Sequence, residues 1–480
     1  MSMPDNNLDD RPVHDGPSPE SRRGSGGTVA AWAVILAVTV MVASAHMLQP
    51  RRPTENGRLH GAVATFQTRY LVGAASVLCE RAAEPLERQV KQWQPDAPET
   101  QLRAAVTAGE LIGPEAALER LRAIDHQPQA DGTPHEFAAP REVLVRLYED
   151  YAEDRIDGPS ASPAQRQQLR ERLGWLGDLA LAPPGSDTAL REQVLAAARR
   201  TFFFVVGGVV ALAVLGLVGV VVLVVFLAYL FANVLPGLRP APERSGIYAE
   251  AFAWWLVAFV GLSIAGGWVF GPDALGATGF LAMIGSLAAL AWPRMRGIPW
   301  EHVRDDVGWT TGRGAGVELL AAVGCYAMAI PLVVLALILT GAIIGGWAHQ
   351  GFGTLATATH PAAEWLVEGT WWQRVQVLLL ACVIAPIVEE VAFRGLLYRH
   401  LRDATRTMRR GSSVLLSAAV SSVLFALLHP QGLLAVPALT AIALALTFTR
   451  EWRNTLVPSI VAHGLNNAVV MAVLLTILAK

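Results

Sequence analysis

Residues 375–402 read VQVLLLACVIAPIVEEVAFRGLLYRHLR and are long and apolar enough to form a membrane-crossing helix. Within this stretch lie the charged side chains of Glu389, Glu390 and Arg394. On insertion scales, a charge near the bilayer centre costs at least ~2.5–3.5 kcal/mol, so each of these residues needs a partner or a function. The stretch therefore predicts a membrane helix with one face turned to a polar interior.

The composition of the whole chain agrees with this prediction. Hydrophobic residues make up 53% of the 480 residues, charged residues 16%, and the mean hydropathy is +0.38. Soluble domains carry roughly a quarter charged residues, so a soluble enzyme is excluded. The formal net charge of −2 indicates no polyanionic partner such as a nucleic acid, and no CxxC pair supports a disulfide framework or a thiolate zinc site.

The apolar pattern divides the chain into five parts. Residues 1–27 are polar and rich in Gly, Pro and Ser, which predicts a disordered cytoplasmic tail. Residues 28–48 can cross a bilayer, and we interpret them as an anchor. Residues 49–200 are rich in Arg and Glu with helical apolar spacing, which predicts a soluble helical domain. Membrane helices then return in 201–348 and 349–480.

We therefore predict an all-α, polytopic transmembrane bundle of about nine spans, with a soluble helical domain inserted after the first span. The expected spans are 28–48, 202–235, 249–270, 275–293, 316–347, 372–397, 413–429, 432–449 and 455–479.

Arginines cluster in alternate connections between these spans, whereas 271–274, 348–371 and 430–431 contain neither Lys nor Arg. The positive-inside rule then predicts a cytoplasmic N-terminus and an extracytoplasmic 49–200 domain.

Within the long stretch, Glu390 and Arg394 have the i,i+4 spacing of an ion pair. Glu389 lies about 100° around the helix from Glu390 and stays free to face a cavity as a general base. Alternatively, the pair is a packing salt bridge, or Arg394 extends to the nearby membrane surface.

Two later spans carry further polar side chains. His429 precedes Pro430 at a helix end, with Phe425 one turn earlier, and His463 and Asn467 share a face of the last span. Each motif alone also suits an interfacial cap or an interhelical hydrogen bond. Together they favour one polar pocket suited to hydrolysis. His429 can reach the depth of Glu389 only if its helix begins in the cytoplasm, within the Arg-rich stretch after Arg402, or is strongly tilted, and we expect the former.

The three motifs EExxxR, FxxxH and HxxxN, in this order on membrane helices, resemble the CPBP family of type II CAAX prenyl proteases and Abi proteins, which process bacteriocins or confer immunity to them. The resemblance covers about 372–475. It implies a CPBP-like catalytic core in 349–480, peptide-bond hydrolysis in the membrane, and residence in a bacterial cytoplasmic membrane. The implied catalytic residues are Glu389, Glu390, Arg394, His429, His463 and Asn467.

In this resemblance, Glu389 activates water with His429, Glu390 and Arg394 order it, and His463 and Asn467 bind the oxyanion. Glu389, His429 and His463 could also supply the three protein ligands of a catalytic Zn²⁺. The lack of carboxylates beyond Glu390 to orient the imidazoles favours the metal-free form.

The implied partners are the lipid bilayer and a membrane-associated protein or peptide substrate. A prenylated CAAX tail is not the expected substrate in a bacterial host. Two other classes of function stay open from the residues: a proton-coupled transporter, which intramembrane Glu, His and Arg would suit, and a non-catalytic scaffold or bacteriocin-immunity protein.

Overall fold

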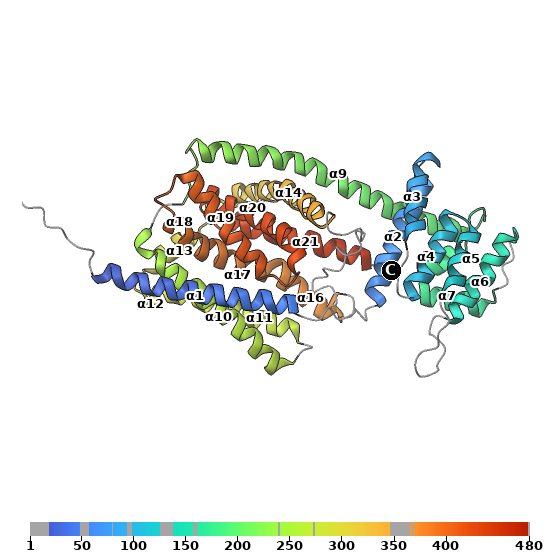
Figure 1. The fold of residues 1–480 in the computed structure, drawn as a ribbon, viewed down its shortest axis with the longest axis horizontal. Helices are drawn as coiled ribbons and strands as arrows, with labels where there is room; N and C mark the ends of the chain where they lie inside the picture. Colours follow the sequence, from blue (N-terminus) through green and yellow to red (C-terminus); the bar gives the residue numbers. More distant parts are fainter. Residues whose placement is uncertain are drawn as a thin grey trace, which may run out of the picture. The chain divides into compact units, whose positions relative to one another are not determined.

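The computed structural model describes the chain except for 1–18, 49–56, 79, 94–97, 125–137, 157–160, 239–240, 272–273, 346–364, 367–368 and 479–480. In the residues that it describes, every regular element is a helix, which confirms the predicted all-α class. The chain forms two compact units (Figure 1). One comprises Met1–Gln49, Val218–Thr359 and Val375–Ala468, and the other Pro50–Leu217, His360–Arg374 and Val469–Lys480.

Nine helices of the described part are long and apolar enough to cross a membrane. They correspond to the nine predicted spans, and the chain is a multi-pass membrane protein. The candidate spans are Gly26–His46, Ala189–Phe231, Ser245–Phe270, Gly276–Met295, Ala315–Ala342, Trp371–Ala404, Arg410–Leu427, Leu433–Arg453 and Val457–Leu478.

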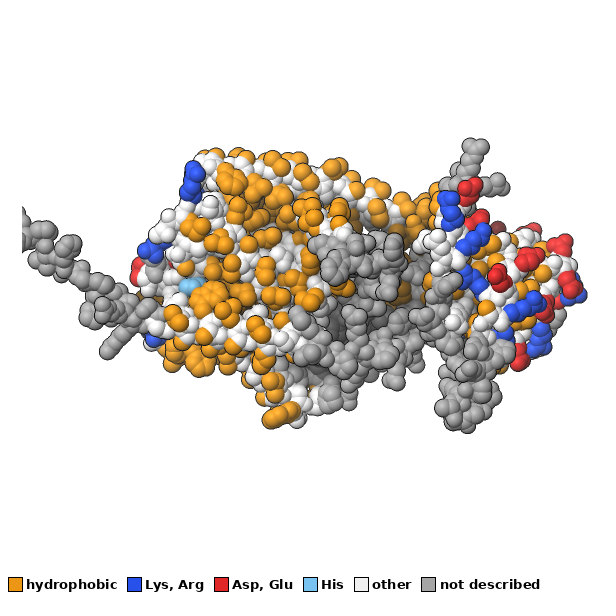
Figure 2. Space-filling view, in the orientation of Figure 1, with side chains coloured by type: hydrophobic (Ala, Val, Ile, Leu, Met, Phe, Trp, Pro, Cys, Tyr) orange, Lys and Arg blue, Asp and Glu red, His pale blue; other side chains and the backbone are white. Residues whose placement is uncertain are grey.

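Apolar side chains on these helices point outward as well as inward. Apolar groups cover the visible face of the membrane helices, whereas acidic and basic side chains gather over the helical domain (Figure 2). On α9 (Ala189–Phe231), for example, Val209 is 61% exposed and Leu217 is 70% exposed. A helix that is apolar all round requires an apolar surrounding, which a bilayer supplies.

The first unit contains the glutamates and is built from helices of both halves of the chain. Its largest core joins α1 (Pro19–Leu48) and α10 (Ser245–Phe270) to the helix that bears Glu389. The other elements with residues in this unit are the end of α9, α11 (Leu275–Ser286), η2 (Leu287–Leu290), α12 (Ala291–Met295), α13 (Trp300–Val307), α14 (Ala315–Gly345), α19 (Arg410–Leu427), η6 (Leu433–Ala435), α20 (Val436–Arg453) and α21 (Val457–Leu478) as far as Ala468, with η1 (Pro242–Arg244) before α10.

The second unit has its own apolar core, formed by α2 to α8 with the start of α9. Its helices begin and end at recognisable signals. In α7, for instance, the Ser162 side chain accepts from the Gln165 N–H, the Gln165 side chain accepts from the Ser162 N–H, and Pro163 follows the cap. The helices are α2 (Gly57–Val77), α3 (Glu80–Gln92), α4 (Pro98–Leu111), α5 (Pro114–Ala123), α6 (Ala138–Ala152), α7 (Pro163–Leu173) and α8 (Trp175–Ala180).

The start of α1 differs from the prediction. The composition of residues 1–27 predicts disorder, but α1 begins at Pro19. Once the apolar span has formed a helix, each further residue adds one hydrogen bond without a new nucleation cost, so the helix extends into the polar segment. Residues 1–18 of the predicted tail lie outside the described residues.

Candidate active site

The two glutamates lie on one long helix that is not a regular α-helix throughout. It runs from Trp371 to Ala404, and we call it the glutamate helix. Two π-helical stretches flank the glutamates, which the 3.6-residue spacing used for the prediction does not anticipate. Its parts are α16 (Trp371–Leu379), η4 (Leu380–Ile384), α17 (Ala385–Glu390), η5 (Val391–Leu397) and α18 (Tyr398–Ala404).

The first π stretch frees a backbone carbonyl for a side chain of the last span. The N–H of Ala385 donates to the Leu380 carbonyl, five residues back, instead of to the Ala381 carbonyl. Asn467 Nδ2 donates to that free Ala381 carbonyl over 2.8 Å. The close approach of the two helices is possible because residue 464 is glycine: a Cβ there would lie 2.6 Å from the Cys382 carbonyl oxygen.

Glu390 and Arg394 form the predicted ion pair, and both side chains are fully buried. Arg394 Nη1 lies 2.7 Å from Glu390 Oε1. Helix α20 supplies the remaining acceptors: Arg394 Nε donates to Thr447 Oγ1 over 3.3 Å, and Nη2 donates to the Ala443 carbonyl over 3.0 Å. A buried arginine of this kind requires several acceptors, because each unpaired N–H would be costly.

Thr447 and Ala443 were not among the predicted site residues. No charge or imidazole marks their span in the segment TAIALALTF, and threonines are ordinary in apolar helices. A backbone carbonyl has no signature in the sequence at all. Only packing of α20 against the glutamate helix brings these acceptors to Arg394.

Glu389 faces two imidazoles from two other helices. Its Oε2 lies 3.7 Å from His429 Nε2 and 3.8 Å from His463 Nε2. This oxygen is buried and has no direct hydrogen-bond partner. Glu389 and His429 keep 13% and 18% of their side-chain surface exposed, whereas Glu390 keeps none. A small molecule such as water can therefore reach the carboxylate of Glu389, whereas the carboxylate of Glu390 is fully buried.

Each imidazole is oriented through its other ring nitrogen. His429 Nδ1 contacts the Phe425 carbonyl at 2.6 Å, one of the last carbonyls of α19 that have no helical donor. His463 Nδ1 contacts Glu390 Oε1 at 3.0 Å. Because these acceptors favour a proton on Nδ1, both Nε2 atoms present lone pairs toward Glu389.

The Phe425 ring packs against two residues of the glutamate helix. The Phe425 ring lies under the Arg394 guanidinium at 4.8 Å and packs edge-on against Phe393. Helix α19 begins at Arg410, within the Arg-rich stretch and three residues before the predicted start at 413, and His429 lies beside Glu389.

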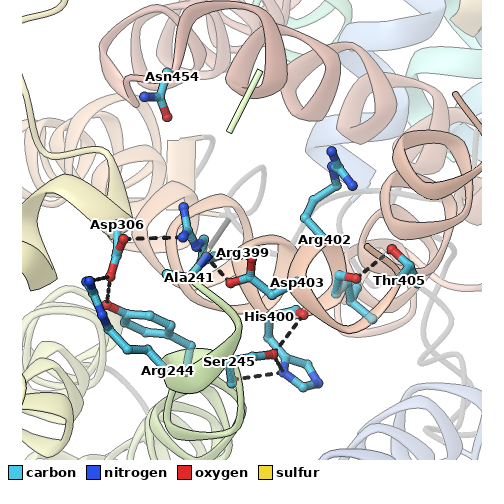
Figure 3. A network of polar contacts seen from close by, with 12 residues as sticks. Ala241, Arg244, Ser245, Asp306, Arg399, His400, Arg402, Asp403, Thr405 and Asn454 are labelled. Atoms are coloured by element: carbon cyan, nitrogen blue, oxygen red, sulfur yellow. Dashed lines mark hydrogen bonds and ion pairs between the residues drawn. The ribbon is translucent and has the colours of Figure 1, made fainter. Parts of the chain in front are cut away.

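A second polar network lies where the glutamate helix meets α13 (Figure 3). Asp306 Oδ2 accepts from Arg244 Nη1 at 2.5 Å and from Tyr248 Oη at 2.6 Å. Its Oδ1 lies 3.3 Å from Arg399 Nη2, and Arg399 also pairs with Asp403 at 3.1 Å. Asp306 thus ties α10 and α13 to the glutamate helix, two and a half turns beyond Glu390.

The three predicted zinc ligands lie slightly farther apart than a tetrahedral zinc ion would hold them. Such an ion, with donors about 2.0–2.2 Å away, would hold them about 3.3–3.6 Å apart. The separations from Glu389 Oε2 are wider, and among the described residues no group of three His, Cys, Asp or Glu side chains is arranged to hold a metal. A water molecule, which hydrogen-bonds at about 2.8 Å, spans both separations.

Both imidazoles are oriented although the sequence offers no carboxylate beyond Glu390 for that purpose. Glu390 orients the imidazole of His463 while it pairs with Arg394, and the Phe425 carbonyl orients the imidazole of His429. The backbone carbonyl of Phe425, near the end of α19, orients His429 in place of a carboxylate.

Fold and site together define a polytopic helical membrane protein whose buried carboxylates and imidazoles meet on three spans. Residues 370–469 match the family described as type II CAAX prenyl endopeptidase Rce1-like. This match supports a CPBP/CAAX protease domain at these residues and, with it, a CAAX-protease-like endopeptidase. No curated protein and no solved structure matches the chain.

Proposed function

We propose that this chain is an intramembrane endopeptidase that hydrolyses peptide bonds of membrane-associated proteins or peptides, with Glu389 as the general base. The observation that carries the proposal is the unpartnered, buried Oε2 of Glu389 between two imidazole nitrogens at 3.7 and 3.8 Å. A water molecule between them satisfies this oxygen, which would otherwise be a costly unpaired acceptor.

In the proposed reaction, Glu389 takes a proton from this water, and the oxygen attacks the carbonyl carbon of the scissile peptide bond. The second water hydrogen donates to Nε2 of His429 or His463. When the C–N bond breaks, the proton held by Glu389 passes to the amine that leaves. The Glu390–Arg394 ion pair keeps His463 and the helix around Glu389 in position, and it stays buried during the reaction.

Asn467 is the proposed donor to the oxyanion. A carboxamide has two N–H donors, and the contact with the Ala381 carbonyl uses one of them. Family resemblance also implies that His463 binds the oxyanion. Its contacts support a different role, because Nδ1 faces Glu390 and Nε2 faces Glu389. We assign His463 to holding the water.

The Arg-rich connections place the ends of the spans near Arg402 and Arg453 in the cytoplasm, by the positive-inside rule. This orientation puts the α2–α8 unit outside. We infer that the substrate is a polypeptide segment that reaches Glu389 from within or beside the bilayer.

The test compares the peptides in membranes that carry the wild-type chain with those in membranes that carry Glu389→Gln. Glutamine keeps the shape of glutamate and cannot act as a base, so we expect cleavage to fall by about 10²–10⁴-fold. Glu301→Gln is the matched control, because Glu301 is an exposed carboxylate on α13. A parallel sample with a metal chelator tests the zinc alternative, and we expect unchanged cleavage.

Equal peptide profiles in wild type and Glu389→Gln, with equal amounts of inserted protein, would contradict the proposed endopeptidase function. Glu389-dependent proton uptake in liposomes would then indicate a transporter. A normal phenotype without either activity would indicate a scaffold or immunity protein. Loss of cleavage with the chelator, restored by zinc, would contradict the metal-free reaction alone.

A further inference from the structure

A third histidine lies close to this site, on a helix that the family match does not include. His46 is near the end of α1, in the first span. The match begins at residue 370, so nothing in the EExxxR, FxxxH and HxxxN motifs points to it.

Helix α1 is fixed against the glutamate helix by a direct contact. Trp32 Nε1 donates to His400 Nε2 over 3.0 Å. His400 is in turn held by Ser245, whose hydroxyl lies 3.0 Å from Nδ1. Ala31 and Ile35, on either side of Trp32, are buried in the same core as Phe393. The register of α1 is therefore set by polar and apolar contacts.

This register brings His46 to the depth of Glu389. The two helices run in opposite directions, with α1 beginning near α18 and leading back past α17 (Figure 1). His46 lies 14 residues after Trp32, about 21 Å at 1.5 Å per residue, and Glu389 lies 11 residues before His400, about 16 Å. His46 thus lies about 5 Å, or one turn, beyond Glu389.

A second observation places His46 beside the site independently. Its ring interacts electrostatically with His429 and lies against the backbone of that residue. Helix α1 also packs directly on α19, and His429 lies two residues past the end of that helix. The contacts of α1 at Trp32 and at His46 therefore support the same position of this helix beside the site.

The Nδ1 atom of His46 is buried and has no hydrogen-bond partner. The N–H of the neutral ring faces the His429 backbone through the other nitrogen, so Nδ1 carries the lone pair. Leaving a buried acceptor unpaired costs about 1–3 kcal/mol, so such a group in a site calls for a partner that arrives with the substrate. A peptide segment entering beside Glu389 brings backbone N–H groups, which are donors for an imidazole lone pair.

We propose that His46 is a substrate-binding residue whose Nδ1 accepts a hydrogen bond from a backbone N–H of the peptide held at Glu389. This inference rests on the proposed endopeptidase function and extends its site to the first span. The peptide would then be held between an acceptor on α1 and the water on the glutamate helix.

The experiment uses the full-length protein and a quenched fluorescent peptide. Its sequence is that of a peptide released by wild type and not by Glu389→Gln. His46→Ala should lower kcat/KM by about 10–100-fold without changing the thermal midpoint of unfolding. His46→Asn, whose side-chain oxygen replaces the Nδ1 lone pair as an acceptor, should restore most of the loss. Val42→Ala, one turn earlier on α1, is the control for lost volume and should stay within about threefold of wild type.

Several outcomes would overturn the role of His46. One is a His46→Ala protein that cleaves as fast as Val42→Ala. Another is a loss that comes with a lower thermal midpoint and is not restored by asparagine, which would indicate packing alone. In both cases Glu389→Gln stays inactive, so the endopeptidase stands. If Glu389→Gln cleaves the peptide like wild type, the proposed function itself fails.

Discussion

Glu390 Oε1 lies 3.0 Å from His463 Nδ1, although 73 residues separate the two in the chain. The same oxygen lies 2.7 Å from Arg394 Nη1. One sealed carboxylate therefore neutralises the arginine and orients the imidazole, while its neighbour Glu389 keeps an oxygen without a partner. The adjacent glutamates thus have different surroundings, and different consequences of mutation follow.

Glu390→Gln should destabilise the protein, and Glu389→Gln should not. Loss of the charge at position 390 leaves Arg394 buried without a counter-ion, which typically costs about 3–5 kcal/mol. Glu389 Oε2 has no direct partner to lose. Thermal unfolding of both purified variants in detergent checks this, and equal midpoints would show that Glu390 is not the structural carboxylate. Cleavage should be low in both.

Asn467→Ala should lower kcat by about 10²–10³-fold with little change in KM, because the amide stabilises charge that develops only in the transition state. Thr476→Ala, at an exposed position of α21 where the hydroxyl donates to the Ala472 carbonyl, is the control and should change kcat by less than about threefold. Steady-state kinetics on the peptide substrate supply the measurement. A rise in KM at constant kcat would instead assign Asn467 to ground-state binding.

Gly464→Ala should impair both folding and cleavage. The added Cβ would lie 2.6 Å from the Cys382 carbonyl oxygen, so α21 must move away from the glutamate helix, and the Asn467–Ala381 contact lengthens. Gly324→Ala on α14 meets nothing within 4 Å and should be neutral or stabilising by up to about 1 kcal/mol, because alanine favours helix. Unfolding midpoints compare the two. A neutral Gly464→Ala would mean that this helix contact is not close.

Asp306→Ala should lower the free energy of unfolding by about 3–5 kcal/mol, because Arg244 and Arg399 lose the carboxylate that they share. Asp305→Ala, on the exposed face of the same helix, should change it by less than about 0.5 kcal/mol. Denaturant or thermal unfolding distinguishes them. At a temperature where the variant stays folded, its pH profile of cleavage should match that of wild type, since Asp306 lies far from the reacting groups.

Much of the fold could be predicted because its signals are local. Length and hydropathy of each apolar run mark the spans, and nine candidate helices lie where nine were expected. The boundary at Pro19 and the two π stretches were missed. Helix extension into a polar segment and a change from four-residue to five-residue hydrogen bonds leave the apolar pattern almost unchanged.

The sequence by itself determined that this is a helical membrane protein and that Glu390 pairs with Arg394, because residues four apart on one helix are neighbours whatever surrounds them. Tertiary structure alone decided what each polar side chain meets on another helix: Thr447 at Arg394, Glu390 at His463, the Ala381 carbonyl at Asn467, and His46 at His429. Periodicity fixes which face of a helix is polar. Which helix covers that face is set by how all the spans pack, and that depends on the whole chain at once.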